Sequence, residues 1–315
     1  MDFMKTINQN KNSSIDISEV NMLAENPAAF ISQCEEEYRS QLEALAQRVK
    51  ESGGLYRVIA LAGPSSSGKT TTAHKLSQAF GRCGVEAPVV SLDDFYLGRD
   101  LYPKLSNGQP DMEAVEALDL PLINETLKEL TQNGVATFPV FDFENSCRSS
   151  VNNMISLGEN GVLIIEGIHA LNPRLVELMD KNRIFKVYVS VRTKYMLGEE
   201  EILCPKDARL IRRMVRDHNF RGKAPWETLK SWKEVLDGEE KHIYPFRDEV
   251  DYKIDSALDY EGCVFHHYIL PMIDAFKDQG VYSDKLGQIV DILECFNDID
   301  KAYIPKDSLL REFIG

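Results

Sequence analysis

Five short apolar runs along the chain predict buried β-strands. Each run is hydrophobic at nearly every position, which is typical of strands whose two faces are both covered by other elements. Helical stretches separate most of the runs, so the pattern predicts a parallel sheet with crossover helices. The runs cover residues 58–62, 88–92, 162–165, 184–191 and, as the weakest of the five, 250–254.

The segments that flank these runs follow other patterns. Residues 1–26 are polar and charged without a sustained apolar period, so we expect a loosely packed leader there. Between Pro27 and Gly54, apolar residues recur at spacings of three and four, which predicts an amphipathic helix. After residue 256 the pattern is helical, with a polar break near residues 278–280. We therefore expect a leader and helix at 1–54, an α/β domain at 55–255 and a helical extension at 256–315.

Composition limits the partners and the compartment. With 315 residues, of which 43% are hydrophobic, the chain can bury a large core. Its formal net charge of -14 disfavours nucleic acids and anionic membranes as partners, because their phosphate groups would be repelled. No apolar run approaches the ~20 residues that a membrane span needs, and no signal peptide is found. The six cysteines are scattered without a C-x-x-C pair, so we expect free thiols and a cytoplasmic protein.

A phosphate-binding loop follows the first predicted strand. Gly63-x-x-x-x-Gly68-Lys69-Thr70 matches the P-loop pattern and leads into a helical segment, as that motif requires. Backbone N–H groups of such a loop and the helix dipole bind phosphate, Lys69 would bridge the β- and γ-phosphates, and Thr70 would bind magnesium. The alternative, an ordinary Gly/Ser-rich turn, requires all four signature residues to coincide by chance. The expected ATP-contacting residues are Gly63, Ser65, Ser66, Ser67, Gly68, Lys69, Thr70 and Thr71.

Carboxylates follow two of the other predicted strands. Asp93 and Asp94 come directly after the second run, and Glu166 ends the third. Because ligands bind at the carboxyl ends of parallel strands, one of these aspartates could accept a proton from an attacking hydroxyl. An aspartate pair that only caps a turn is the alternative, more so for Asp94 than for Asp93. Thr70, Glu166 and Asp93, together with phosphate oxygens, are a sufficient set of magnesium ligands.

An arginine-rich segment at residues 208–223 stands out in this acidic chain. Its arginines recur at helical spacing, while apolar residues supply a second side of the helix. We expect a movable lid at about 205–225, with Gly222 as a hinge, that clamps the transferred phosphoryl group and excludes water. A solvated basic helix face is the alternative. The arginines at helical spacing are Arg209, Arg212, Arg213 and Arg216.

These motifs together resemble the uridine kinase and phosphoribulokinase family of P-loop kinases over residues 56–255. The motifs are the loop at 63–72, Asp93-Asp94-Phe95-Tyr96, Pro139-Val140-Phe141-Asp142-Phe143, Ile165-Glu166-Gly167 and the arginine run at 212–223. The resemblance implies a three-layer α/β fold with a parallel five-stranded sheet, an Arg-rich lid and helical additions at both ends. It also implies Mg²⁺- and ATP-dependent phosphorylation of a nucleoside or sugar hydroxyl.

The resemblance assigns roles to single residues. Asp93 matches the catalytic base, and Arg213, Arg216 and Arg221 match phosphate- and substrate-binding arginines. We expect Lys69 and Arg216 to act in catalysis beside Asp93, and Arg212 to bind ATP. The residues expected to contact the acceptor are Asp94, Tyr96, Phe141, Arg148, His169, Arg213 and Arg221, although a lone histidine near a strand end, such as His169, is as often structural.

Several positions depart from the pyrimidine kinases. Phe141, Ser146 and Ser231 stand where those kinases carry a tyrosine, a histidine and a glutamine that hold the base. Because strong discrimination depends on such polar partners, uridine itself is in doubt as the acceptor, whereas phosphoryl transfer is not. A sugar or a sugar phosphate stays open as the acceptor.

The second half of the chain also carries Ser231-Trp232, Gly238-Glu239-Glu240, Ile243-Tyr244-Pro245-Phe246 and the segment at 308–315. Through these residues it resembles bacterial nucleoside-kinase-like proteins that are often classed as uridine kinases. Many of these carry an N-terminal domain similar to part of threonyl-tRNA synthetase. Because only about 55 residues precede the first predicted strand, we expect that domain to be missing here. Family members often self-associate, which leaves a homo-oligomer open. The alternative function is an NTP-binding regulator with slow hydrolysis, but Asp93, Lys69, Thr70 and Glu166 are all present and no guanine-reading Asn/Thr-Lys-x-Asp segment is found.

Overall fold

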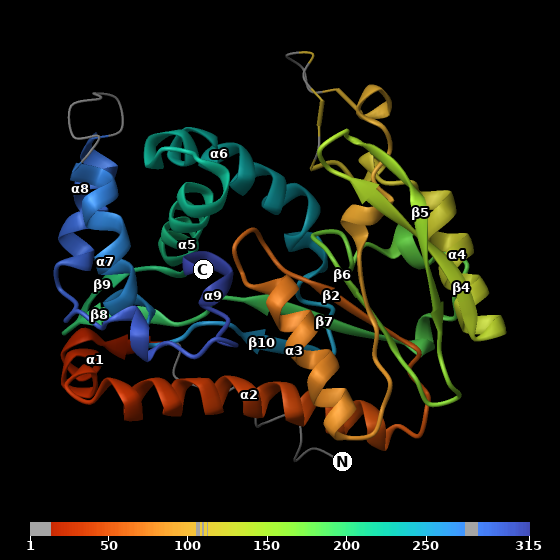
Figure 1. Cartoon of the computed structure of the whole chain (residues 1–315), viewed down its shortest axis with the longest axis horizontal. Coiled ribbons are helices and arrows are strands. Elements are labelled where there is room, and N and C mark those ends of the chain that lie inside the picture. Colours follow the sequence, from red (N-terminus) through yellow and green to blue (C-terminus); the bar gives the residue numbers. More distant parts are fainter. Residues whose placement is uncertain (1–13, 105–107, 109, 112, 275–282) are drawn as a thin grey trace.

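Five parallel strands form the central sheet of the computed structural model, which describes residues 14–104, 108, 110–111, 113–274 and 283–315. The strand order is β10-β7-β2-β6-β3, and every neighbouring pair is parallel (Figure 1). All five predicted runs enter this sheet, with ends that differ from the predicted ones by at most two residues, so the predicted sheet is confirmed. The strands are β2 (Val58–Ala62), β3 (Val89–Ser91), β6 (Leu163–Glu166), β7 (Ile184–Ser190) and β10 (Tyr252–Asp255).

Alternate residues of β2 belong to two different cores. Ile59 and Leu61 pack with α2 (Pro27–Glu51) and α3 (Lys69–Arg82), whereas Val58 and Ala60 pack with α4 (Leu120–Asn133) on the other face of the sheet. All five residues of β2 are buried. The near-continuous hydrophobicity of the run therefore reflects cover on both faces. The predicted amphipathic helix is confirmed as α2, which lies along one side of the molecule in Figure 1.

The expectation of a loosely packed leader is wrong for residues 14–26. This segment forms β1 (Ser14–Asp16) and α1 (Ile17–Ala24), and Ile17 and Val20 are buried. Strand β1 pairs in parallel with β8 (Lys194–Leu197), which pairs antiparallel with β9 (Glu200–Leu203). A pairing partner far away in the sequence therefore orders a segment that has too few apolar residues to order itself. Residues 1–13 of the predicted leader lie outside the described residues.

A β-hairpin that the apolar pattern did not predict covers one edge of the molecule. Its strands, β4 (Val135–Asp142) and β5 (Cys147–Ser156), are antiparallel, with Phe141 opposite Arg148. Figure 1 shows the hairpin beside α4. The hairpin therefore carries both Phe141 and Arg148 on one element.

The rest of the chain is mainly helical. The remaining α-helices are α5 (Pro205–Arg221), α6 (Pro225–His242), α7 (Glu261–Asp274), α8 (Ser283–Leu293) and the short α9 (Arg311–Ile314). The 3₁₀ turns are η1 (Leu92–Phe95), η2 (Arg99–Leu101), η3 (Val115–Ala117), η4 (Pro173–Val176), η5 (Lys181–Arg183), η6 (Tyr244–Phe246) and η7 (Lys301–Tyr303). The predicted polar break at 278–280 lies outside the described residues. Within the described ranges, no helix combines the length and the apolar character that a membrane crossing requires.

Candidate active site

The loop between β2 and α3 depends on two glycines. Gly68 has φ 77°, in the left-handed region that glycine favours. At Gly63, an added Cβ would lie 2.3 Å from the carbonyl oxygen of Val189 on the neighbouring strand, so only glycine fits there. The loop leads directly into α3, whose first amides have no partner within the helix. The sequence signature therefore folds into a loop that ends at a helix N-terminus, which is an anion site.

Two serines of this loop have buried hydroxyls without partners. Ser66 and Ser67 are 3% and 0% exposed, and their Oγ atoms make no hydrogen bond among the described residues. Buried polar groups of this kind are costly unless a ligand satisfies them. Ser65 differs, because its amide donates to Glu239 Oε1 at 3.0 Å and its Oγ accepts from Arg213 Nη1 at 2.6 Å. Ser65 is therefore engaged by the protein, while Ser66 and Ser67 fit a bound phosphate.

Glu166 connects the loop helix to the neighbouring strands. Its Oε1 accepts hydrogen bonds from Ser91 Oγ at 2.9 Å and from Thr70 Oγ1 at 3.3 Å, and its buried Oε2 has no partner among the described residues. Burial raises the pKa of Glu166, and the positive charge of Lys69 opposes that increase. A divalent cation at Oε2 would satisfy this carboxylate and favour its ionised form.

Asp93 and Asp94 lie in η1, directly after β3, but they have different surroundings. Partial desolvation raises the pKa of Asp93; Lys69 lowers it and Asp94 raises it further. The pKa of Asp94 is also raised by desolvation, and its Oδ1 accepts a hydrogen bond from the amide of Phe141 at 3.1 Å. Asp94 therefore attaches η1 to the hairpin, while Asp93 shares its electrostatic environment with Lys69 and Glu166.

Glu113 is a carboxylate of this region that the sequence motifs did not indicate. Desolvation raises its pKa, and the positive charges of Lys69 and Arg213 lower it. Asp93 also contributes to its pKa, so these groups share one neighbourhood. No motif marks Glu113, because it lies in an irregular segment between η2 and η3.

Aromatic rings line the predicted acceptor side. The ring of Phe141 lies 6.0 Å from that of Tyr96 and 5.1 Å from that of Phe143, and Tyr96 also contacts Tyr102 at 5.8 Å. Arg148 forms an ion pair of 2.9 Å with Asp119. Phe141 and Arg148, both expected to contact the acceptor, lie opposite each other on the two strands of the hairpin, and the Phe141 amide bonds to Asp94 of η1.

His169 is buried after β6 and faces a second histidine. It is 2% exposed, and its ring lies 5.6 Å from that of His242. Burial, helped by His242, lowers the pKa of His169 to about 4, so the ring is neutral near neutral pH. Neither ring nitrogen has a hydrogen-bond partner of good geometry within the described ranges, although the nearby backbone of Glu113 raises the pKa slightly. A neutral imidazole with open nitrogens can contact a polar ligand, but it carries no charge with which to bind phosphate.

Two arginines of α5 are held inside the protein, against expectation. Arg209 makes a bidentate ion pair with Glu239 and donates to Ser65 O at 3.0 Å. Arg212 is 0% exposed and bonds to Glu261 and to the carbonyl oxygen of Ser256. Arg212 Nη1 also donates to the carbonyl oxygen of Ser66 at 3.5 Å, so its guanidinium connects the loop to these buried partners, and its contact with ATP stays a prediction. The alternative interpretation, that these arginines form a solvated basic face of the helix, is wrong for Arg209 and Arg212, because both are buried.

The other three arginines of α5 surround a buried aspartate. Asp217 is 0% exposed and lies 3.5 Å from Arg213, 2.9 Å from Arg216 and 3.3 Å from Arg221. Arg213 also reaches Ser65, so this cluster borders the loop. One carboxylate balances three guanidinium groups, and the cluster keeps net positive charge beside the loop.

No group of three or more His, Cys, Asp or Glu side chains among the described residues could hold a metal ion by itself. The arrangement of Thr70 and Glu166 suits a cation that is completed by phosphate oxygens and water. The site therefore combines a phosphate loop, a cation position, a carboxylate beside a lysine and an aromatic acceptor side, which together can support phosphoryl transfer.

Comparisons with known proteins agree with this geometry. Residues 58–260 match the sequence model of the Phosphoribulokinase / Uridine kinase family. The uridine kinase of Oceanobacillus iheyensis is 32% identical over 167 residues, covering 53% of this chain and 70% of that protein. The uridine kinase of Lactobacillus helveticus is 30% identical over 168 residues, with the same coverage. The match to the solved structure of phosphoribulokinase from Rhodobacter spheroides covers 63% of this chain and 69% of that one, at 18% identity and a TM-score of 0.44.

Proposed function

Because the chain belongs to the phosphoribulokinase and uridine kinase family, we infer that it is a kinase that phosphorylates a hydroxyl of a small molecule. We propose that this acceptor is a nucleoside or a related ribosyl compound. ATP is the phosphoryl donor that the family implies. The observation that carries the proposal is Glu166, which bridges Thr70 and Ser91 and keeps a buried, unpartnered oxygen beside the phosphate loop. Thr70, Glu166 and Asp93 would hold Mg²⁺. Its positive charge would offset the negative charge of the phosphates.

The proposed reaction assigns one task to each group. Asp93 accepts the proton of the acceptor hydroxyl. In the same step, the oxygen of that hydroxyl bonds to the γ-phosphorus, while the bond between the γ-phosphorus and the β,γ-bridging oxygen breaks. Lys69 and the loop amides stabilise the charge that gathers on the departing ADP. Arg213 bonds to Ser65 of the loop, and Arg216 and Arg221 share the Asp217 carboxylate with it. Their net positive charge would stabilise the transferred group.

The acceptor side supports a compound other than uridine. Phe141 has no hydroxyl and packs between Tyr96 and Phe143. The Ser231 hydroxyl donates to the carbonyl oxygen of Thr228 in its own helix, so it is engaged away from any ligand. A base edge would therefore lose polar partners at two of the three positions that differ from the pyrimidine kinases.

The test is a screen for ADP release from MgATP across nucleosides, pentoses and sugar phosphates, with Asp93→Asn run in parallel. One acceptor that stimulates release in the wild type, but not in the variant, supports the proposal and identifies the substrate. Release that is slow and indifferent to every acceptor and to Asp93 contradicts it, and favours the NTP-binding regulator.

A further inference from the structure

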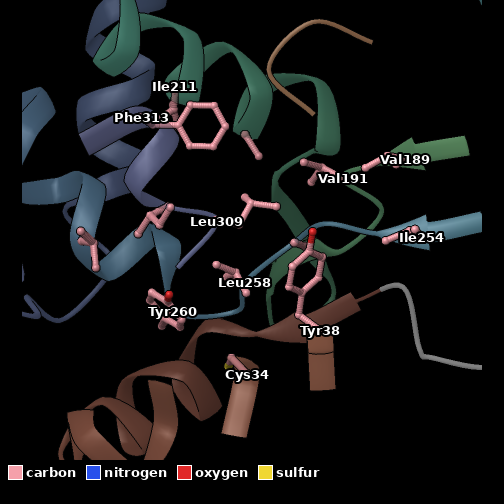
Figure 2. Packing of buried hydrophobic residues seen from close by; sticks show 14 of the residues in the cluster. Cys34, Tyr38, Val189, Val191, Ile211, Ile254, Leu258, Tyr260, Leu309 and Phe313 are labelled. Atoms are coloured by element: carbon pink, nitrogen blue, oxygen red, sulfur yellow. The ribbon is translucent and has the colours of Figure 1, made fainter. Parts of the chain in front are cut away.

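The segment at residues 308–315 lies against the first turn of α3. A Cβ built on Gly68 would meet the Leu309 side chain at 2.7 Å. Thr71 Oγ1 donates a hydrogen bond of 2.6 Å to Glu312 Oε2. Figure 2 shows Phe313 beside Ile211 of α5 and Leu309 between Phe313 and Leu258, and Tyr38 of α2 belongs to the same cluster. One short segment therefore contacts the phosphate loop and the helix that follows it.

This segment is part of the core. Leu309, Leu310 and Phe313 are each 0% exposed. The Ser308 hydroxyl lies 3.0 Å from that of Tyr260, and Asn219 donates to the carbonyl oxygen of Phe313 at 3.1 Å. Because displacing the segment would expose three large apolar side chains and break these bonds, a nucleotide must bind with the segment in place.

Thr71 lies where a nucleotide's phosphate chain meets the helix. In a P-loop the lysine reaches the β- and γ-phosphates, the next hydroxyl residue binds the cation, and the backbone amides face the α- and β-phosphates. Thr71 is the third residue of α3, so its amide is one of those without a partner inside the helix. A carboxylate bound to the Thr71 hydroxyl is therefore next to the α-phosphate end of the site.

We propose that Glu312 is a residue of the nucleotide site that weakens nucleotide binding. Its carboxylate accepts the hydrogen bond of the Thr71 hydroxyl, for which a phosphate oxygen would have to compete. Its negative charge also repels the phosphate chain. Because ADP keeps the α-phosphate, the same contact weakens the product complex and speeds ADP release. This inference rests on the proposed nucleotide site, but it does not depend on the identity of the acceptor.

The test is calorimetric titration of MgADP and MgATP into the wild type, Glu312→Gln and Asp307→Asn. The glutamine keeps an amide oxygen that can accept from Thr71, and removes the charge. Asp307 is the matched control, because it lies in the same part of the chain and pairs with Lys75 of α3 at 3.6 Å, but is 77% exposed. We expect Glu312→Gln to bind both nucleotides about tenfold more tightly, and Asp307→Asn to stay within about twofold of the wild type.

Unchanged or weaker binding by Glu312→Gln overturns the inference, and so does an equal gain in Asp307→Asn, which would show a general charge effect. If the wild type binds no nucleotide, or if Lys69→Met binds as well as the wild type, the proposed nucleotide site fails instead. The gain should shrink at high ionic strength, because salt screens the repulsion. Equal melting temperatures without nucleotide show that the variants are folded.

Discussion

Ser91 and Glu166 lie opposite each other at the carboxyl ends of β3 and β6, and the serine hydroxyl donates a hydrogen bond of 2.9 Å to the glutamate. Thr70 bonds to the same carboxylate oxygen from α3. Ser91 also accepts from the amide of Asp93 at 3.3 Å. A single serine thus orients two of the three proposed magnesium ligands, although no sequence motif marks it.

Replacing Ser91 with alanine should weaken the response to magnesium. Loss of its hydrogen bond frees the Glu166 carboxylate to rotate, and residues that orient metal ligands typically contribute 10–100-fold to metal affinity. We expect the Mg²⁺ concentration for half-maximal ADP release to rise about tenfold in Ser91→Ala. Ser40→Ala, on the exposed side of α2, should respond as the wild type does. If the magnesium titration were unchanged in Ser91→Ala, magnesium binding would not depend on the hydrogen bond between Ser91 and Glu166.

Asp93 and Asp94 should differ sharply when each is changed to asparagine. Asp93→Asn removes the proposed proton acceptor, so kcat should fall at least about a hundredfold while MgADP still binds. Asp94→Asn keeps an oxygen that can accept from the Phe141 amide, so its kcat should stay within about tenfold of the wild type. Single-turnover rates and ADP titrations of both variants provide the comparison. Equal losses in the two variants would refute Asp93 as the only base.

The sheet and the phosphate side of the site could be predicted from the sequence because their signals are local. Strand ends place Asp93 and Glu166 at one edge, and the loop signature places Lys69 and Thr70 beside them. The structure brings Thr70 and Glu166 into contact across 96 positions of sequence, as strand topology requires.

The rest depends on partners that no local pattern names. Helical spacing gave the faces of α5, but not Glu261, which lies 49 positions from Arg212 and turns it into a buried support. The contact between Thr71 and Glu312 spans 241 positions. Strand β5 has one buried residue in ten, so its hydrophobic pattern carries no strand signal, and pairing with β4 determines its conformation.

The buried and the exposed arginines of α5 should differ in their effect on stability. Arg209→Met leaves the Glu239 carboxylate, whose side chain is 3% exposed, without its main partner, which typically costs 3–5 kcal/mol, so we expect the free energy of unfolding to fall by about that amount. Arg221 is 49% exposed, so Arg221→Met should change it by less than about 1 kcal/mol. Urea unfolding of both variants measures this difference. Similar losses in the two variants would contradict a division of these arginines into internal supports and site residues.

His169 should make stability depend on pH in the mildly acidic range. Its pKa falls from 6.5 to about 4 in the folded protein because burial disfavours the charged ring. Between these values the unfolded chain binds the proton and the folded protein does not, so stability rises with pH there. The contribution is fully present above about pH 6.5 and is lost as pH falls towards about 4, with a total of at most about 3–4 kcal/mol.

The variant His169→Asn tests that sign directly. It removes the titrating ring, so its free energy of unfolding should vary less between pH 4.5 and 7 than that of the wild type, whatever its absolute stability. His74→Asn, at an exposed position on α3, should keep the wild-type slope. His242 lies against His169, and burial lowers its pKa as well, so part of the slope should remain in His169→Asn and should be smaller in the double variant. If the free energy of unfolding of His169→Asn varied with pH as steeply as that of the wild type, His169 would make no contribution to the pH dependence. That result would contradict a lowered pKa for His169 in the folded protein.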